Sequence, residues 1–256
     1  MITRYRAWMD GEGLHDVDPA VIITDIRESK PEENIVTAGN GYRDGQRVLY
    51  RHREALSVTI RFMIREYDVA RRKGILSRVL AWAHDGWLQI NDRPEQRLRV
   101  VCEDMPAITS ALKWTEELSV VFTAYAVPYW QETHAVSVSG SGQSGTVHLA
   151  PLGDMPCCLE ANISNTGSGT LNILTLTAGN RSFAFSGLGL ASGKTLTIRY
   201  AEDTGLLRME IEGESVMNKR TAASADDLLL YPGSNTITFT ADQQISGIFK
   251  ARGLWR

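Results

Sequence analysis

The chain has 256 residues, of which 43 % are hydrophobic, and 27 Lys+Arg stand against 30 Asp+Glu. This length suits one large or two ordinary domains that can bury a core without disulfide bonds. The net charge of −3 and the pI near 6.0 argue against a general binder of nucleic acid or membrane surfaces, which would carry a basic excess.

Targeting and redox signals are weak. No apolar run approaches the roughly 20 residues that cross a bilayer. Residues 1–10 contain Arg4 and Arg6 without the apolar segment of a signal peptide, so none is expected. Three cysteines are an odd and low number, which is typical of a chain that folds in a reducing compartment.

The composition changes near residue 133. Residues 1–133 hold 18 Lys+Arg, 20 Asp+Glu and 7 of the 22 glycines, whereas residues 134–256 hold 9, 10 and 15. We therefore expect an N-terminal domain over residues 1–133 and a C-terminal domain over residues 146–256. The intervening residues 134–145 are rich in serine and glycine, which predicts a flexible linker.

The first half predicts strands around one helix. Residues 21–26 are strand-like, and the polar, glycine-containing residues 27–46 predict a long loop or projecting arm. Residues 56–64 alternate apolar and polar side chains, which indicates a half-buried strand. Further strands are expected at residues 87–90, 96–102 and 117–126.

The helix is expected over residues 67–83, with Asp68 as its N-cap and Gly86 as a stop beyond its end. Its expected buried face consists of Val69, Leu76, Val79, Leu80 and Ala83. Arg71, Arg72 and Lys73 are expected on the opposite face, in contact with solvent.

The second half predicts strands alone, separated by turns that contain glycine, serine and asparagine. The expected strands cover residues 146–150, 157–164, 170–177, 182–185, 195–200, 206–212, 235–240 and 247–254. Short strands at intervals of roughly ten residues predict a β-sandwich or jelly roll.

Ser192-Gly-Lys-Thr195 matches the end of a phosphate-binding loop. The full motif needs a glycine where this chain has Leu188, and a helix where residues 195–200 predict a strand. A hairpin turn is therefore expected here.

No other motif selects a catalytic, metal or cofactor site. The five histidines lack metal-ligand spacing, and the side chains of Cys157 and Cys158 are expected to point to opposite faces of a strand. No nucleophile-elbow motif occurs, and nothing singles out a pair of carboxylates for glycoside hydrolysis. We expect no catalytic residue, no metal and no cofactor.

Aromatic and charged residues suggest contacts with other proteins. Trp82, Trp87, Trp114 and Trp130 are expected to be core or interface anchors, with a sugar-binding platform as the alternative. The arm combines basic and acidic residues: Arg43, Arg47, Arg51 and Arg53 with Glu28, Glu32 and Glu33. Opposite charges on one projecting segment favour contact between identical neighbours in a ring, with DNA phosphates or a partner's carboxylates as alternatives for the arginines.

Several segments, in this order, resemble the distal tail proteins (Dit) of long-tailed bacteriophages. In the first half they are residues 49–68, 82–88, 92–94, 112–126 and 128–130. In the second half they are residues 159–161, 166–171, 226–228, 232–235 and 249–255. The resemblance covers nearly the whole chain.

The resemblance implies a mainly β, non-enzymatic virion protein. It implies an N-terminal β-sandwich-like or split-barrel domain with one α-helix that builds a hexameric ring, and a peripheral C-terminal galectin-like β-sandwich. Such a ring joins the tail tube to the tail-tip hub or baseplate, carries receptor-binding proteins in many phages, and lets DNA pass through its lumen. The implied location is the virion tail tip, and the host cytoplasm during assembly, without membrane contact.

We expect the ring contact on residues 27–48, 56–66 and 68–84. The candidate interface residues are Arg43, Arg47, Arg51, Arg53, Glu32, Glu33, Arg61, Arg71 and Arg72. Two alternatives remain: a carbohydrate-binding module, and a glycoside-active enzyme that uses unrecognised carboxylates.

Overall fold

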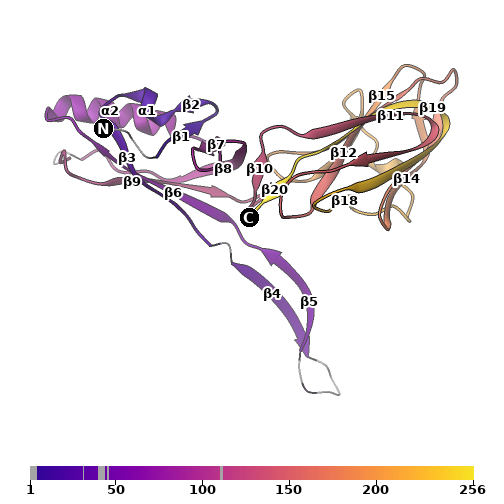
Figure 1. The fold of residues 1–256 in the computed structure, drawn as a ribbon, viewed down its shortest axis with the longest axis horizontal. Helices are drawn as coiled ribbons and strands as arrows, with labels where there is room; N and C mark the ends of the chain where they lie inside the picture. Colours follow the sequence, from indigo (N-terminus) through magenta and orange to yellow (C-terminus); the bar gives the residue numbers. More distant parts are fainter. Residues whose placement is uncertain (1–4, 31, 40–43, 45, 110–111) are drawn as a thin grey trace. The chain divides into compact units, whose positions relative to one another are not determined.

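The computed structural model describes residues 5–30, 32–39, 44, 46–109 and 112–256. The chain separates into two units, Met1–Tyr129 and Trp130–Arg256 (Figure 1). Each unit is built on antiparallel strands, so the expected mainly β fold class is confirmed. Neither helix in the described part of the chain is long and apolar enough to cross a bilayer.

The first unit contains an antiparallel sheet with the strand order β2-β1-β7-β8-β9-β6-β3. The strands are β1 (Ala7–Met9), β2 (Glu12–Gly13), β3 (Val21–Glu28), β6 (Leu56–Ile64), β7 (Gly86–Ile90), β8 (Gln96–Asp104) and β9 (Leu118–Ala124). Strand β6 lies next to the end of this order, and it pairs with β3 on one side and with β9 on the other. Val58, Ile60 and Phe62 are fully buried, which confirms the alternation expected for this strand.

Helix α2 (Val69–Trp82) begins where the sequence indicates, because the Asp68 side chain accepts a hydrogen bond of 2.7 Å from the Arg71 amide. A four-residue helix that the sequence did not predict, α1 (Leu14–Val17), also belongs to this unit. The expected buried face of α2 is partly wrong. The buried residues are Arg72, Ile75, Leu76, Val79 and Trp82.

Arg72 is only 3 % exposed, so its expected place on the solvent face is wrong, whereas Val69 is 44 % exposed. The buried stripe passes through Arg72 and Ile75 rather than Val69. The Arg72 side chain is tolerated on the buried face of α2 because one guanidinium nitrogen donates a 2.6 Å hydrogen bond to the Glu66 carbonyl.

The segment expected as a loop or arm is an arm made of two strands. β4 (Glu33–Gly39) and β5 (Gln46–Arg53) pair with each other in a separate two-stranded sheet. The arm continues the β3–β6 ribbon, because Ser29 donates its amide to the Ser57 carbonyl and Glu54 donates its amide to the Glu32 carbonyl. Figure 1 shows the arm leaving the end of β3 and β6. These strands could not be recognised from the sequence, because the rest of the unit buries neither face of the arm and the residues therefore show no alternation of apolar and polar side chains.

The second unit is a β structure with the strand order β14-β13-β19-β12-β15-β16-β17. Its main strands are β11 (Val136–Leu149), β12 (Cys157–Asn165), β13 (Leu171–Ala178), β14 (Arg181–Leu190), β15 (Thr195–Tyr200), β16 (Leu207–Ile211) and β19 (Asn235–Ala251). Short elements complete it: β10 (Trp130–Glu132), β17 (Glu214–Ser215), a 3₁₀ turn (Met217–Lys219), β18 (Leu229–Leu230) and β20 (Leu254–Trp255).

Strand β19 organises the second unit. Its first part pairs with β13 and its last part with β12, while β11 runs beside it along nearly its whole length. The two strands expected at residues 235–240 and 247–254 are thus mostly one continuous strand. The alternation of buried and outward residues encloses one apolar cluster, which includes Phe183, Phe239 and Phe249.

The linker expected over residues 134–145 is wrong, because most of this segment belongs to β11. Its backbone pairs with β19 from Val136 to Leu149, with one irregularity between Gly142 and Ser144. Packing explains a glycine here: a Cβ on Gly145 would lie 2.5 Å from the ring of Phe239. The glycines make room for a ring instead of giving the chain flexibility.

Candidate interaction surfaces

The arm exposes large apolar side chains to solvent. Ile35 is 45 % exposed on β4, and Val48, Leu49 and Tyr50 are 44–56 % exposed on β5. The Tyr50 ring stacks on His52 at a centroid distance of 5.9 Å. An isolated two-stranded hairpin is marginally stable in water, and its outer edges offer unpaired backbone groups. The arm is therefore a surface that a partner would stabilise.

The charged residues expected on the arm are placed as follows. Glu32, Glu33 and Arg47 are exposed. Arg53 is half-buried, and its guanidinium carbon lies 5.0 Å from the centre of the Tyr129 ring, a cation–π geometry. The backbones of Arg51 and Ile35 pair across the hairpin, as do those of Arg53 and Glu33. Arg43 lies outside the described residues.

The other candidate interface arginines already have partners within the chain. Arg61 pairs with Glu117 at 3.3 Å, and Arg71 pairs with Glu66 at 3.1 Å. Both pairs are partly exposed, so each remains available at the surface and contributes little to stability. Arg72 is buried within the unit, and we remove it from the candidate interface.

A second exposed surface lies beside the start of α2. Tyr67 is 77 % exposed and Trp114 is 44 % exposed, and their ring centroids lie 5.2 Å apart at 49°. We call these two residues the aromatic pair. Tyr67 was not predicted as a surface residue from the sequence, although the sequence contains a signal for it. An apolar residue just before an N-cap often packs against an apolar residue at the fourth position of the helix. This position is Arg72 here, so Tyr67 lacks the usual apolar partner on the helix.

The four tryptophans do not form a platform for a sugar. Trp82 and Trp130 are buried, as expected for core anchors. The Trp82 indole donates a 2.8 Å hydrogen bond to the Glu12 carbonyl and meets Phe122 edge-on. Trp87 is covered by the guanidinium group of Arg97, 3.8 Å from the ring centre.

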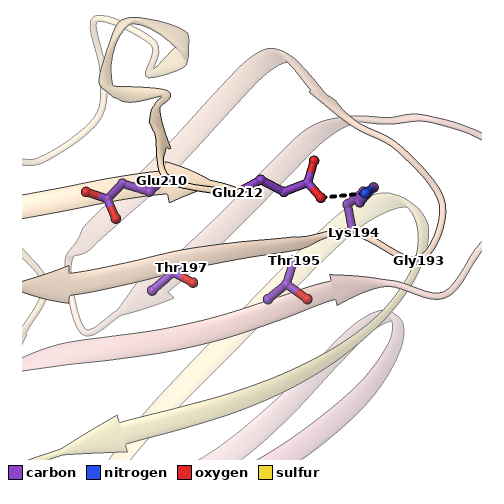
Figure 2. Close-up of a pocket in the computed structure, with 7 residues that line it drawn as sticks. Gly193, Lys194, Thr195, Thr197, Glu210 and Glu212 are labelled. Atoms are coloured by element: carbon purple, nitrogen blue, oxygen red, sulfur yellow. Dashed lines mark hydrogen bonds and ion pairs between the residues drawn. The ribbon is translucent and has the colours of Figure 1, made fainter.

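A shallow depression of about 400 Å³ lies on the second unit (Figure 2). Its lining residues are Gly193, Lys194, Thr195, Thr197, Glu210, Glu212 and Gly213. The turn before Thr195 is followed by strand β15 and not by a helix, so a phosphate-binding loop is excluded. The predicted hairpin turn is wrong, because the turn joins β14 to β15 and these strands do not pair: β14 pairs with β13, and β15 pairs with β12 and β16. Lys194 and Glu212 form an ion pair across the rim, and Glu210 pairs with Arg199 at 3.0 Å. Hydroxyls and carboxylates without an aromatic lining suit weak hydrogen bonding to a polar ligand.

The described residues contain no group of three histidine, cysteine or acidic side chains that could hold a metal ion. Burial raises the pKa of the Cys102 thiol to about 11 and that of the Cys157 thiol to about 12. Burial also raises the pKa of Cys158 to about 11. Thiols with such raised pKa values stay protonated near neutral pH and are poor nucleophiles and metal ligands.

No protein-family model matches the chain, and a search of the curated proteins finds no match. Among solved structures, the chain is similar to the SPP1 Dit (gp 19.1) protein, described as a paradigm of the hub adsorption apparatus in phages that infect Gram-positive bacteria. The sequences are 13 % identical, the alignment covers 97 % of this chain and 98 % of that chain, and the TM-score is 0.69. The resemblance to the Dit family is thus confirmed at the level of the fold.

The chain is also similar to chains of the phage p2 baseplate in its activated conformation. With strontium, the identity is 8 %, the coverage 97 % of both chains and the TM-score 0.49. With calcium, the identity is 8 %, the coverage 99 % of this chain and 98 % of that chain, and the TM-score again 0.49.

Proposed function

We propose that this chain is a distal tail protein, a structural component of a phage tail tip. Six copies would close into a ring that joins the tail tube to the tail-tip hub. The unit Met1–Tyr129 would build the ring and the unit Trp130–Arg256 would lie at its periphery. The role would be one of shape and surface contact, without catalysis.

The observation that carries this proposal is the fold similarity to SPP1 Dit over the full length of both chains. Both units of this chain fall within the alignment, since it covers 97 % of the residues. A match to only one β-sandwich would be common among unrelated proteins, because this architecture serves many functions. Two different units in the same order are a more specific match.

The arm supports self-assembly on physical grounds. A ring needs a heterologous interface, in which one surface of a copy contacts a different surface of the next copy. The arm supplies one such surface, because it carries exposed apolar side chains and unpaired strand edges. Exposed Arg47 and Glu32 add charge that can select a partner and set the register.

The remaining partners follow from the proposed role. They are the tail tube protein, the tail-tip hub and, in some tails, receptor-binding proteins. Phage DNA would meet the ring only in transit through its lumen. The net charge of −3 suits such a channel, because an acidic wall does not retain a polyanion. The protein would assemble in the host cytoplasm and function in the virion.

Electron microscopy of the purified full-length chain tests this proposal. We expect six-fold rings with a central opening, together with a mass near six times that of the monomer by mass photometry. A chain that stays monomeric up to the concentrations used for microscopy, with its native fold verified by circular dichroism, would contradict the proposal.

A carbohydrate-binding module is a second candidate, because the depression beside β15 and β16 presents hydroxyl and carboxylate groups. Glycan-array binding by the full chain would support it, provided that Thr197→Ala lowers the signal. Thr240→Ala, at an exposed threonine outside the depression, is the matched control. Full-chain binding to no glycan, or equal binding by both variants, would exclude this depression as the site.

A further inference from the structure

We infer that the arm of one copy docks on the aromatic pair, Tyr67 and Trp114, of the next copy. This inference rests on the proposed ring, because it names the surface that receives the arm. It makes the contact head-to-tail: each copy offers its arm to one neighbour and its aromatic pair to the other.

The aromatic pair has the properties of an interface anchor. Tyrosine and tryptophan are enriched among the residues that dominate binding energy. Tyr67 and Trp114 already touch each other, so their rings lose little further freedom when a partner covers them. Together they expose roughly 250 Å². That is about a third of what one side of a standard interface buries, so the pair would anchor a larger contact.

The arm offers matching chemistry. Val48, Leu49 and Tyr50 are consecutive on β5, and each is 44–56 % exposed. Consecutive residues of a strand point to opposite faces, so apolar groups are available on both faces of the arm. Exposed Arg47 lies next to Val48 and can stack on an aromatic ring of the partner. Aliphatic, aromatic and guanidinium groups all pack favourably on exposed tyrosine and tryptophan rings.

The topology of the first unit prevents the arm from reaching its own aromatic pair. The arm joins β6 at the Leu56 end, whereas Tyr67 follows the Ile64 end. Trp114 precedes β9, and the pairing of Leu118 with Phe62 puts it at the same far end. Nine residues of strand separate the two ends by roughly 30 Å.

The root of the arm is also held in the extended direction. The Ser29 amide donates to the Ser57 carbonyl at 2.8 Å, and the Glu54 amide donates to the Glu32 carbonyl at 2.9 Å. These bonds continue the β3–β6 ladder into the arm, which therefore points away from β6 (Figure 1). The arm and the aromatic pair lie at opposite ends of one ribbon, as a head-to-tail contact between copies requires.

Two complementary variants test the inference. Tyr50→Arg disables the arm and leaves the aromatic pair intact, whereas Trp114→Arg does the reverse. Both side chains are exposed, so neither change should unfold the protein.

Mass photometry reads out the assembly of these variants. Under conditions where the unmodified chain forms rings, each variant alone should remain monomeric. Their mixture should form one-to-one dimers and nothing larger, because only one intact interface remains. Tyr125→Arg, at another exposed aromatic residue, is the control and should form rings.

A cross-linking experiment gives an answer that does not depend on disabling variants. A photoreactive benzophenone amino acid replaces Tyr50, and isotopically labelled and unlabelled copies are mixed before irradiation. We expect intermolecular cross-links to peptides that contain Tyr67 or Trp114. Rings that form with cross-links only to other segments, or rings of Trp114→Arg, would overturn this inference and leave the proposed function standing. Absence of any assembly by the unmodified chain would overturn both.

Discussion

The side-chain amide of Asn165 donates a 2.8 Å hydrogen bond to the main-chain carbonyl of Leu190, 25 residues away in the sequence. The same amide nitrogen donates to the Gly169 carbonyl at 2.8 Å, and the side-chain oxygen accepts from the Gly167 amide at 3.0 Å. Asn165 is fully buried. One side chain therefore fixes the turn after β12 and the end of β14 at once.

Replacement of this side chain should be costly. We expect Asn165→Ala to lower the free energy of unfolding by about 2–4 kcal/mol, because buried backbone groups lose their partners. Chemical denaturation followed by fluorescence measures the change. Asn180→Ala, at an exposed turn residue of the same unit, should change stability by less than about 0.5 kcal/mol. Equal effects of the two substitutions would contradict this role for Asn165.

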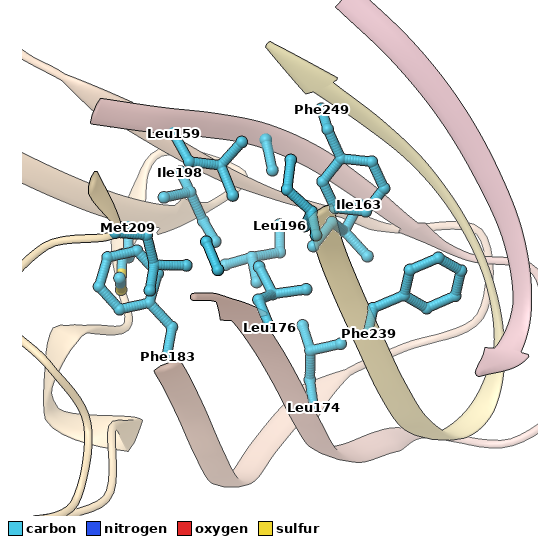
Figure 3. Close-up of a cluster of buried hydrophobic side chains, with 14 of the residues drawn as sticks. Leu159, Ile163, Leu174, Leu176, Phe183, Leu196, Ile198, Met209, Phe239 and Phe249 are labelled. Carbon is cyan, nitrogen blue, oxygen red and sulfur yellow. The ribbon is translucent and has the colours of Figure 1, made fainter. Parts of the chain in front are cut away.

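Two glycines should respond in opposite directions to alanine. Phe239 stacks on Phe249 at 5.7 Å in the core of the second unit (Figure 3), and a Cβ on Gly145 would lie 2.5 Å from the Phe239 ring. Gly145→Ala should therefore destabilise the chain by about 1–3 kcal/mol through overpacking. Gly74 lies in α2 with no atom within 4 Å of an added Cβ, so Gly74→Ala should stabilise by about 0.5–1 kcal/mol. Thermal unfolding of the two variants separates these outcomes, and a shift in the same direction for both would refute the packing argument.

Strands with one buried face could be predicted from the sequence, because burial imposes a period of two. Leu56–Ile64 is the clearest case, since every second residue is buried. The arm could not be predicted as strands, because the chain alone covers neither of its faces. β11 was mistaken for a linker because its glycines fit the space beside Phe239, a contact with a strand about 90 residues later in the chain.

The candidate surface was predicted only in part for a similar reason. Charge marks a residue as solvent-facing on average, yet Arg72 is buried because the Glu66 carbonyl lies within reach of its guanidinium group. Tyr67 was overlooked because an apolar residue normally indicates core. Its exposure depends on two things: the fourth residue of the helix is Arg72 and not an apolar residue, and Trp114 lies beside Tyr67. The first can be read from the sequence, whereas only the folded chain shows the position of Trp114.

The cap of α2 gives a local test of the first unit. The Asp68 carboxylate accepts the Arg71 amide, one of the helix amides without a partner inside the helix. We expect Asp68→Ala to lower the free energy of unfolding by about 1 kcal/mol and Asp68→Asn to retain most of the stability, because asparagine is an equally good N-cap. Urea denaturation measures both variants, and an equal loss in the two would show that charge, rather than capping, matters here.

The buried thiol of Cys157 predicts a loss of stability at alkaline pH. Its ordinary pKa is 9.0, and burial raises the pKa to about 12 in the folded chain, so between these values the unfolded chain releases a proton that the folded chain keeps. The unfolded state then binds fewer protons, and the free energy of unfolding falls as pH rises. The stability that the buried, protonated Cys157 thiol contributes is fully present below pH 9 and is lost progressively up to about pH 12.

The variant Cys157→Ala tests this effect. It removes the thiol, so the urea midpoint of the variant should fall less between pH 8 and pH 11 than that of the unmodified chain. The comparison is made as a difference between the two proteins, because other groups titrate equally in both. Parallel pH profiles would show that the Cys157 thiol ionises as readily in the folded chain as in the unfolded one.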